Sequence, residues 1–176
     1  MFKHLLVPID GSDVTKKSLK NVLDLAKKDD ASITLVYVSD PMPPIVYSDS
    51  SLGYGYSQKD HKKACDAFAK NVFKNALSVL GTGVAVQTLH TFSPSLAGGV
   101  LAAAKKSKAD VIVMASHKRT GIKGLLLGSQ TNEVIVHSSL PVIVLGYSLL
   151  FLCACCLSGV SNIVGKGLGY FTIGWN

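Results

Sequence analysis

Charged residues are scarce in this sequence, and Arg119 is the only arginine. The charged fraction of the 176 residues is 16%, whereas soluble domains average about 25%. The shortage is local, because Lys166 is the only charged residue in residues 146–176. The composition therefore predicts one domain at residues 1–145, followed by an apolar C-terminal extension at residues 146–176 whose origin the composition does not reveal.

The chain also lacks a secretory signal and the paired cysteines of a zinc site. Its first apolar run is interrupted by Pro8 and stopped by Asp10, which makes it too short for a signal peptide. Cys65 is the only cysteine outside the extension, where Cys153, Cys155 and Cys156 form a C-x-C-C pattern. That spacing is not typical of zinc ligands. We therefore expect a cytoplasmic protein with no metal site and no disulfide framework.

Motifs of nucleophilic and phosphate-transfer enzymes are missing as well. The sequence contains neither a G-x-S-x-G elbow nor a Walker A loop, so no catalytic residue is assigned. The net charge of +7 raises nucleic acid as a partner, but the lysines are interspersed with aspartates such as Asp24 and Asp60. Mixed charge of this kind is typical of solvated helix faces. We expect no nucleic-acid partner.

Short apolar runs rich in β-branched residues alternate with helical patterns. The expected strands are residues 4–9, 32–38, 83–90, 110–116 and 141–145, and the expected helices are residues 13–28, 58–80, 95–106 and 129–137. This alternation predicts an α/β fold, with a mostly parallel sheet and helices on both faces. The first helix begins after Ser12 or Asp13 as N-cap. In the second helix, an apolar row four residues apart is the expected buried face: Ala64, Phe68, Val72, Ala76 and Leu80.

Polar residues and glycines gather where the expected strands end. Ligands of open parallel sheets bind beyond the carboxyl ends of the strands, so Asp10, Val38 and residues 115–120 are expected to converge. Asp10 either caps the next turn or accepts hydrogen bonds from a ligand. Gly128 and Ser129 open a helix that is either an ordinary N-cap or an anion site. Residues 40–57 form a connector or a lid.

Histidines offer few candidates for this crevice. Only His117 is expected to lie in it, and the other four are expected to be structural: His4, His61, His90 and His137.

Two segments resemble the universal stress protein family, and the resemblance covers residues 2–145. They are HLLVPIDGSDVTKKSLKNVLDLAKK near the start and VIVMASHKRTGIKGLLLGSQTNEVIVHSSLPVIVL before the extension. The resemblance implies a Rossmann-like fold of the adenine nucleotide alpha hydrolase type, with five parallel strands in the order 3-2-1-4-5. It also implies a cytoplasmic homodimer that acts in stress response and binds ATP, AMP or another adenine nucleotide, with Mg²⁺ as a candidate companion ion. No defined enzymatic activity is implied.

The family's nucleotide-binding members carry G-x-x-G, nine residues, then G followed by S or T. Gly128 and Ser129 match the late half, while Ala115 and Lys118 stand at the two early glycine positions. By resemblance, Asp10 meets the ribose or base and Val38 the adenine. The remaining binding residues implied are Pro8, Ile9 and Met114, then Ala115, His117 and Lys118 at the phosphates, and Gly128, Ser129, Gln130 and Thr131 at the helix start.

The departure at Lys118 does not remove the prediction of nucleotide binding. A lysine in a left-handed backbone costs about 1 to 2 kcal/mol, and its ammonium group returns about 1.5 to 3 kcal/mol against a phosphate. Two alternative functions stay open. One is a dimeric interaction protein that binds no nucleotide, and the other is a weak ATP hydrolase, which is disfavoured because no SGGxDS-like loop follows the first strand.

The last expected strand and the extension bear on assembly. Residues 141–145 read PVIVL, and in the strand order implied by the resemblance they form the edge of the sheet. An apolar edge without a lysine predicts a homodimer centred on Val142 and Val144. Truncation after Leu145 is expected to preserve that dimer. The uncharged segment 147–165 fits a membrane anchor, an apolar arm on the dimer, or a sequence never selected to fold with the domain. We favour the last of these.

Overall fold

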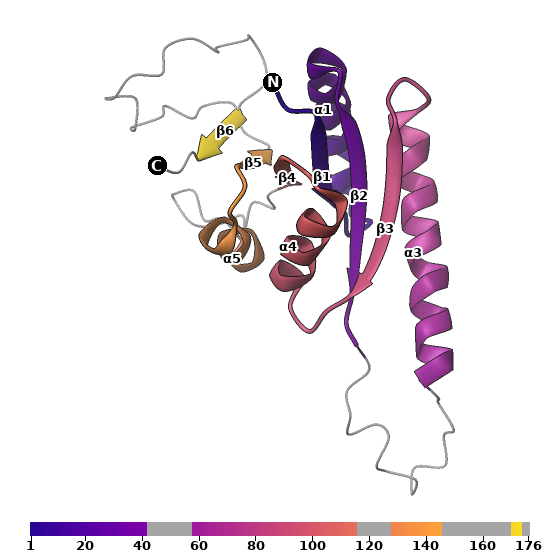
Figure 1. Cartoon of the computed structure of the whole chain (residues 1–176). Coiled ribbons are helices and arrows are strands. Elements are labelled where there is room, and N and C mark those ends of the chain that lie inside the picture. Colours follow the sequence, from indigo (N-terminus) through magenta and orange to yellow (C-terminus); the bar gives the residue numbers. More distant parts are fainter. Residues whose placement is uncertain (42–57, 116–127, 146–169, 174–176) are drawn as a thin grey trace, which may run out of the picture.

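The structure, a computed structural model, describes residues 1–41, 58–115, 128–145 and 170–173. Strands and helices alternate along the chain as the sequence predicts (Figure 1). The elements are β1 (His4–Pro8), α1 (Asp13–Asp29), β2 (Ser32–Ser39), α3 (Gln58–Leu80), β3 (Val86–Phe92), α4 (Leu96–Ser107), β4 (Val111–Ala115), α5 (Ser129–His137), β5 (Val142–Leu145) and β6 (Tyr170–Ile173).

One sheet organises the chain, with the strand order β3-β2-β1-β4-β5-β6. The first five strands are parallel to their neighbours, which confirms the predicted order 3-2-1-4-5. The sixth strand is antiparallel to β5 and comes from the extension. The expectation that β5 is the edge strand is therefore wrong, because β6 pairs along its outer side.

Alternate residues of the strands face two separate cores. Leu5, Ile33 and Leu35 point toward α1 and α3, whereas Leu6 and Val36 point toward α4 and α5. All five are fully buried, because helices cover both faces of the sheet (Figure 1). The near-continuous apolar strands are explained by this two-sided burial.

The buried face of α3 differs from the predicted row. Ala64 is exposed and Phe68 is 54% exposed, while Ala69 and Phe73 are buried in their place. An α-helix has 3.6 residues per turn, so a row spaced strictly by four turns away from any fixed face by about 40° at each step. The expected row therefore follows the sheet only over the C-terminal half of α3.

The edge strand β3 begins three residues later than predicted and ends two residues later. The sheet contact itself starts earlier, because the Ala85 carbonyl accepts a hydrogen bond of 2.9 Å from the Ile33 N–H. In the register of β2 and β3, Tyr37 lies opposite His90 and Ser39 lies opposite Phe92. Because β3 continues two residues past His90, this histidine lies inside the sheet and not at the end of the strand.

The start of α1 is fixed by Ser12, the first of the two predicted caps. Its hydroxyl oxygen accepts from the Thr15 N–H at 3.3 Å. Ser12→Ala is expected to lower the free energy of unfolding by about 1 kcal/mol, because a first-turn N–H loses its acceptor. Urea unfolding measures the change. Ser78→Ala in α3, where the hydroxyl only donates to the Asn75 carbonyl, is the control and is expected to change stability by less than about 0.5 kcal/mol.

Candidate functional site

A fork opens between β1 and β4 at the carboxyl end of the sheet. These strands pair only at Leu5 with Val111 and Leu6 with Ile112. Beyond this point β1 stays with β2, through Pro8 and Val36, and β4 stays with β5, through Ala115 and Leu145. After β1 the chain continues into α1 on one face of the sheet, and after β4 it continues to α5 on the other face. The fork between these two strands is therefore the topological switch point, where such sheets bind ligands.

Asp10 lies just after β1 and is exposed. Its Oδ1 accepts from the Ser12 N–H at 2.9 Å and from the Thr15 hydroxyl at 2.6 Å. The capping role, one of the two readings of this residue, is therefore present. These bonds also fix the orientation of the carboxylate at the mouth of the fork, where an oriented acceptor can meet the hydroxyls of a ligand.

The N-terminus of α5 carries Gly128 as N-cap, without a side-chain hydrogen bond to the first turn. Ser129 and Gln130 are exposed there. A Cβ built on Gly128 meets no atom within 4 Å in the described part of the chain, and its backbone angles, φ −56° and ψ 147°, suit any residue. Neither the backbone angles nor packing against the described residues calls for glycine at this position. The glycine leaves the first N–H groups of α5 open to close approach by an anion.

The other predicted residues divide by burial. Ile9, Met114 and Thr131 are buried. Pro8, Val38 and Ala115 are half-buried at the ends of three adjacent strands. The last two predicted residues, His117 and Lys118, lie outside the described residues, as does most of the predicted connector.

Val38 is held in place from the side of α4. A Cβ built on Gly99 would lie 2.6 Å from Val38 Cγ1 and 3.0 Å from Ser93 Cβ. Gly99 itself is buried. The missing side chain at Gly99 lets α4 approach β2 closely, which fixes the position of the predicted adenine contact.

Sequence reasoning missed a chain of hydrogen bonds that joins α3 to strands β2 and β3. His90 Nδ1 lies 2.8 Å from Asp66 Oδ1, and His90 Nε2 lies 2.8 Å from Ser39 Oγ. Nothing in the local sequence could have shown it, since the three residues come from α3, β3 and β2. The contacts resemble those of a Ser-His-Asp triad, but in such a triad the acid is buried and the serine faces substrate.

In this chain the serine is buried and the acid is the most exposed of the three residues. Ser39 is 6% exposed, the His90 side chain 15% and the Asp66 side chain 42%. The hydrogen bonds therefore tie α3 to the sheet, in agreement with the structural role expected of His90.

Tyr37 lies on the same face of β2 and stacks against the rings of Phe68 and His90 at centroid distances of 5.7 and 5.8 Å. Burial, with smaller contributions from the nearby acidic groups of Cys65, Asp10 and Asp40, raises the pKa of the Tyr37 phenol above its usual value. The phenol therefore stays neutral at physiological pH.

The described residues contain neither a cluster of metal-ligating side chains nor a helix that could span a membrane. Residues 1–41, 58–115, 128–145 and 170–173 hold no group of three or more His, Cys, Asp or Glu side chains suited to a metal ion. Within the same ranges, every helix is too short or too polar to cross a bilayer. The segment 147–165, raised as a membrane anchor, lies outside the described residues.

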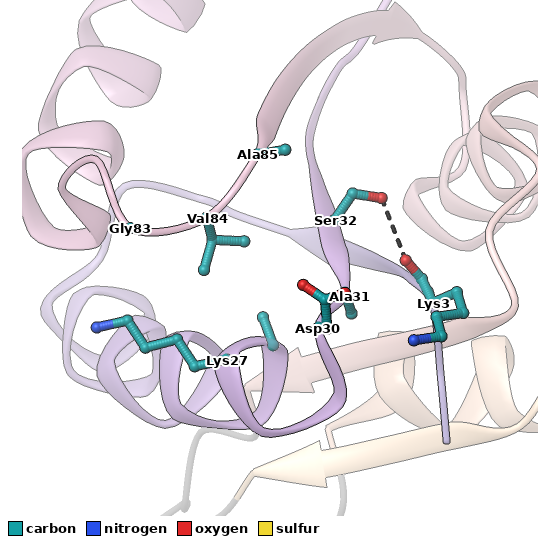
Figure 2. Close-up of a pocket in the computed structure, with 9 residues that line it drawn as sticks. Lys3, Lys27, Asp30, Ala31, Ser32, Gly83, Val84 and Ala85 are labelled. Carbon is teal, nitrogen blue, oxygen red and sulfur yellow. Dashed lines mark hydrogen bonds between the residues drawn. The ribbon is translucent and has the colours of Figure 1, made fainter.

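A cavity of about 410 Å³ lies at the opposite end of the sheet. Figure 2 shows Lys3 and Lys27 extending along its sides, near Gly83 and Asp30. The lysines have a structural explanation. Lys3 Nζ donates to the Asp29 carbonyl at 3.1 Å, and Lys27 lies in the last turn of α1, where cations stabilise the helix dipole. The cavity also contains the Asp30 carboxyl group and so is not a dedicated anion site.

Comparison with known proteins places the chain among stress proteins. The model of the universal stress protein family matches residues 1–146. Universal stress protein MJ0531 of Methanocaldococcus jannaschii is 29% identical over 144 residues, which cover 82% of this chain and 82% of that protein.

Solved structures show the same fold. The structure of hypothetical protein MJ0577, also from M. jannaschii, superposes with a TM-score of 0.66 at 26% identity and covers 85% of this chain and 99% of its own. A universal stress protein in complex with cAMP superposes with a TM-score of 0.56 at 19% identity, over 84% of this chain and 98% of its own.

Proposed function

Because the chain belongs to the universal stress protein family, we propose that it is a cytoplasmic stress-response protein that binds an adenine nucleotide, such as ATP or AMP, at the β1–β4 fork. It acts as a binding module and not as an enzyme. A protein of the same fold is described in complex with cAMP, which supports an adenine nucleotide as the ligand class.

One observation carries the proposal: glycine stands at the start of α5 although no described residue requires it there. Among the described residues, no atom lies within 4 Å of a Cβ built on Gly128, and the N-cap makes no side-chain hydrogen bond to the first turn. Free N–H groups with a partial positive charge at such a site favour phosphate. The proposed division of roles puts the phosphates at Gly128, Ser129, Gln130 and Thr131, with Thr131 acting through its backbone N–H because its side chain is buried.

The sugar and base are proposed to occupy the strand side of the fork. The oriented carboxylate of Asp10 suits the ribose hydroxyls, and Val38, with Pro8 beside it, offers apolar surface to the adenine. Ile9, Met114 and Ala115 form the floor, and His117 and Lys118 remain proposed phosphate contacts. Mg²⁺ would be held through the nucleotide's own phosphates.

Two alternatives make different predictions. A nucleotide-independent interaction protein would bind neither ATP nor AMP. A hydrolase would release phosphate steadily from ATP, and it is disfavoured because no SGGxDS-like loop follows the first strand.

Calorimetry and a turnover assay test the proposal together. The full chain, titrated with ATP, ADP and AMP in the presence of Mg²⁺, is expected to bind one nucleotide per chain, and phosphate release is expected to stay near the uncatalysed rate. Steady, metal-dependent release of phosphate would favour the hydrolase. No heat with any of the three nucleotides would favour the interaction protein.

A further inference from the structure

The C-terminal extension supplies a strand to the sheet. In β6, Ile173 lies opposite Val142, Thr172 opposite Ile143, Phe171 opposite Val144 and Tyr170 opposite Leu145. Each residue of β5 thus has a partner in β6, and the pairing runs along the side of β5 that faces away from β4. Figure 1 shows β6, in yellow, lying beside β5 at this end of the sheet.

Without β6, the outer side of β5 would be an unpaired strand edge. All four residues of β5 are apolar and buried, and none of them is a lysine or proline, the residues that protect natural edges. An edge of this kind attracts any strand with good β-propensity. Residues 170–173 read YFTI, which is aromatic and β-branched throughout.

The direction of β6 is informative about the partner that it replaces. When a strand pairs with its own copy about a two-fold axis, the two strands must run antiparallel. The strand β6 is antiparallel to β5, in a sheet whose other pairs are all parallel. It therefore occupies the edge in the direction that β5 of a second copy would take.

We propose that β6 is an internal substitute for a partner strand. Paired in cis, it satisfies the backbone groups of β5 and keeps the chain monomeric. When β6 leaves β5, the exposed edge binds β5 of a second copy of this chain. The predicted homodimer through residues 141–145 and the β5–β6 pair are then mutually exclusive, and the extension controls assembly.

A pair of proline substitutions in the full chain opens the edge. Successive residues of an edge strand direct their N–H groups alternately toward and away from the neighbouring strand. Phe171→Pro with Thr172→Pro therefore removes an inward donor whichever residue supplies it. Phe171→Val with Thr172→Val keeps the donors and the β-propensity, and it is the matched control.

Light scattering coupled to gel filtration measures the result. The unmodified chain and the valine control are expected to have the monomer mass of 18.6 kDa, and the proline variant twice that mass. Val144 is buried in the core shared with α4 and α5, so circular dichroism must first show that Val144→Lys leaves the proline variant folded. The folded variant is then expected to be monomeric, because like charges meet near the two-fold axis.

Three outcomes would overturn the proposal. The first is a dimer of the unmodified chain, since β6 would then not block association. The second is a proline variant that stays monomeric, and the third is association of that variant that Val144→Lys does not reverse. Aggregation that Val144→Lys does reverse supports the proposal, because it traces the association to the edge of β5. Hydrogen exchange adds an independent check, since residues 142–145 must be protected in the unmodified monomer.

Discussion

Gly128→Val is expected to weaken ATP binding about hundredfold, which corresponds to about 2.7 kcal/mol. The branched side chain would fill the open space beside the first N–H groups of α5, where the phosphates are proposed to bind. The fold is expected to survive, because the new side chain meets no described atom within 4 Å of its Cβ. Loss of a good N-cap residue costs about 1 kcal/mol of stability.

Calorimetry with ATP and urea unfolding measure the two effects of Gly128→Val separately. Val136→Ala is the control on the same helix, since Val136 is 56% exposed and lies two turns away from the helix start. The control is expected to bind ATP as the unmodified chain does. If Gly128→Val kept full affinity, the phosphate site would not be at the start of α5.

Alanine substitutions at the adjacent glycines of α4, Gly98 and Gly99, are expected to change the free energy of unfolding in opposite directions. A Cβ on Gly98 would make ordinary contacts, at 3.5 Å from Ser93 Oγ and 3.7 Å from Ser95 Cβ. Gly98→Ala is therefore expected to stabilise the protein by about 0.5 kcal/mol, through helix propensity. A Cβ on Gly99 would lie 2.6 Å from Val38 Cγ1, and Gly99→Ala is expected to cost about 1 to 3 kcal/mol by overpacking.

Thermal or urea unfolding of both alanine variants provides the measurement, and each is the other's control. Gly99→Ala is also expected to weaken ATP binding, because Val38 must move to make room. Equal stability of the two variants would show that α4 does not approach β2 as closely as the structure has it.

The sheet was predictable because its signals are local. Apolar β-branched runs and the helices between them predict a mostly parallel sheet, and residues 4–8 and 111–115 lie within the expected strands. The strand order itself was implied by the family resemblance. The cap at Ser12 could likewise be narrowed to two residues from the sequence. The strands and the helix cap depend on interactions between residues close together in the sequence, and such interactions leave a recognisable sequence pattern.

The remaining features depend on residues far apart in the chain. The hydrogen bonds from His90 to Ser39 and Asp66 span 51 and 24 residues, and no local pattern marks them. Pairing of Tyr170–Ile173 with β5 was missed for the same reason, since a four-residue run in an apolar segment has no period that distinguishes it. In the candidate site, the sequence proposed Asp10 and Gly128, but only the structure shows that no described residue gives Gly128 a steric reason to be glycine.

Hydrogen exchange with and without ATP tests the central claim most directly, because the two ends of the sheet give different results. Nucleotide at the fork is expected to protect the backbone N–H groups of Asp10 and of residues 129–131, whereas the Ile9 N–H, which already donates to the Val36 carbonyl at 2.9 Å, is expected to change little. The backbone N–H groups around the cavity between Lys3, Lys27 and Gly83 are expected to exchange at the same rate with and without ATP. Protection confined to that cavity, or no protection at saturating ATP, would contradict nucleotide binding at the β1–β4 fork.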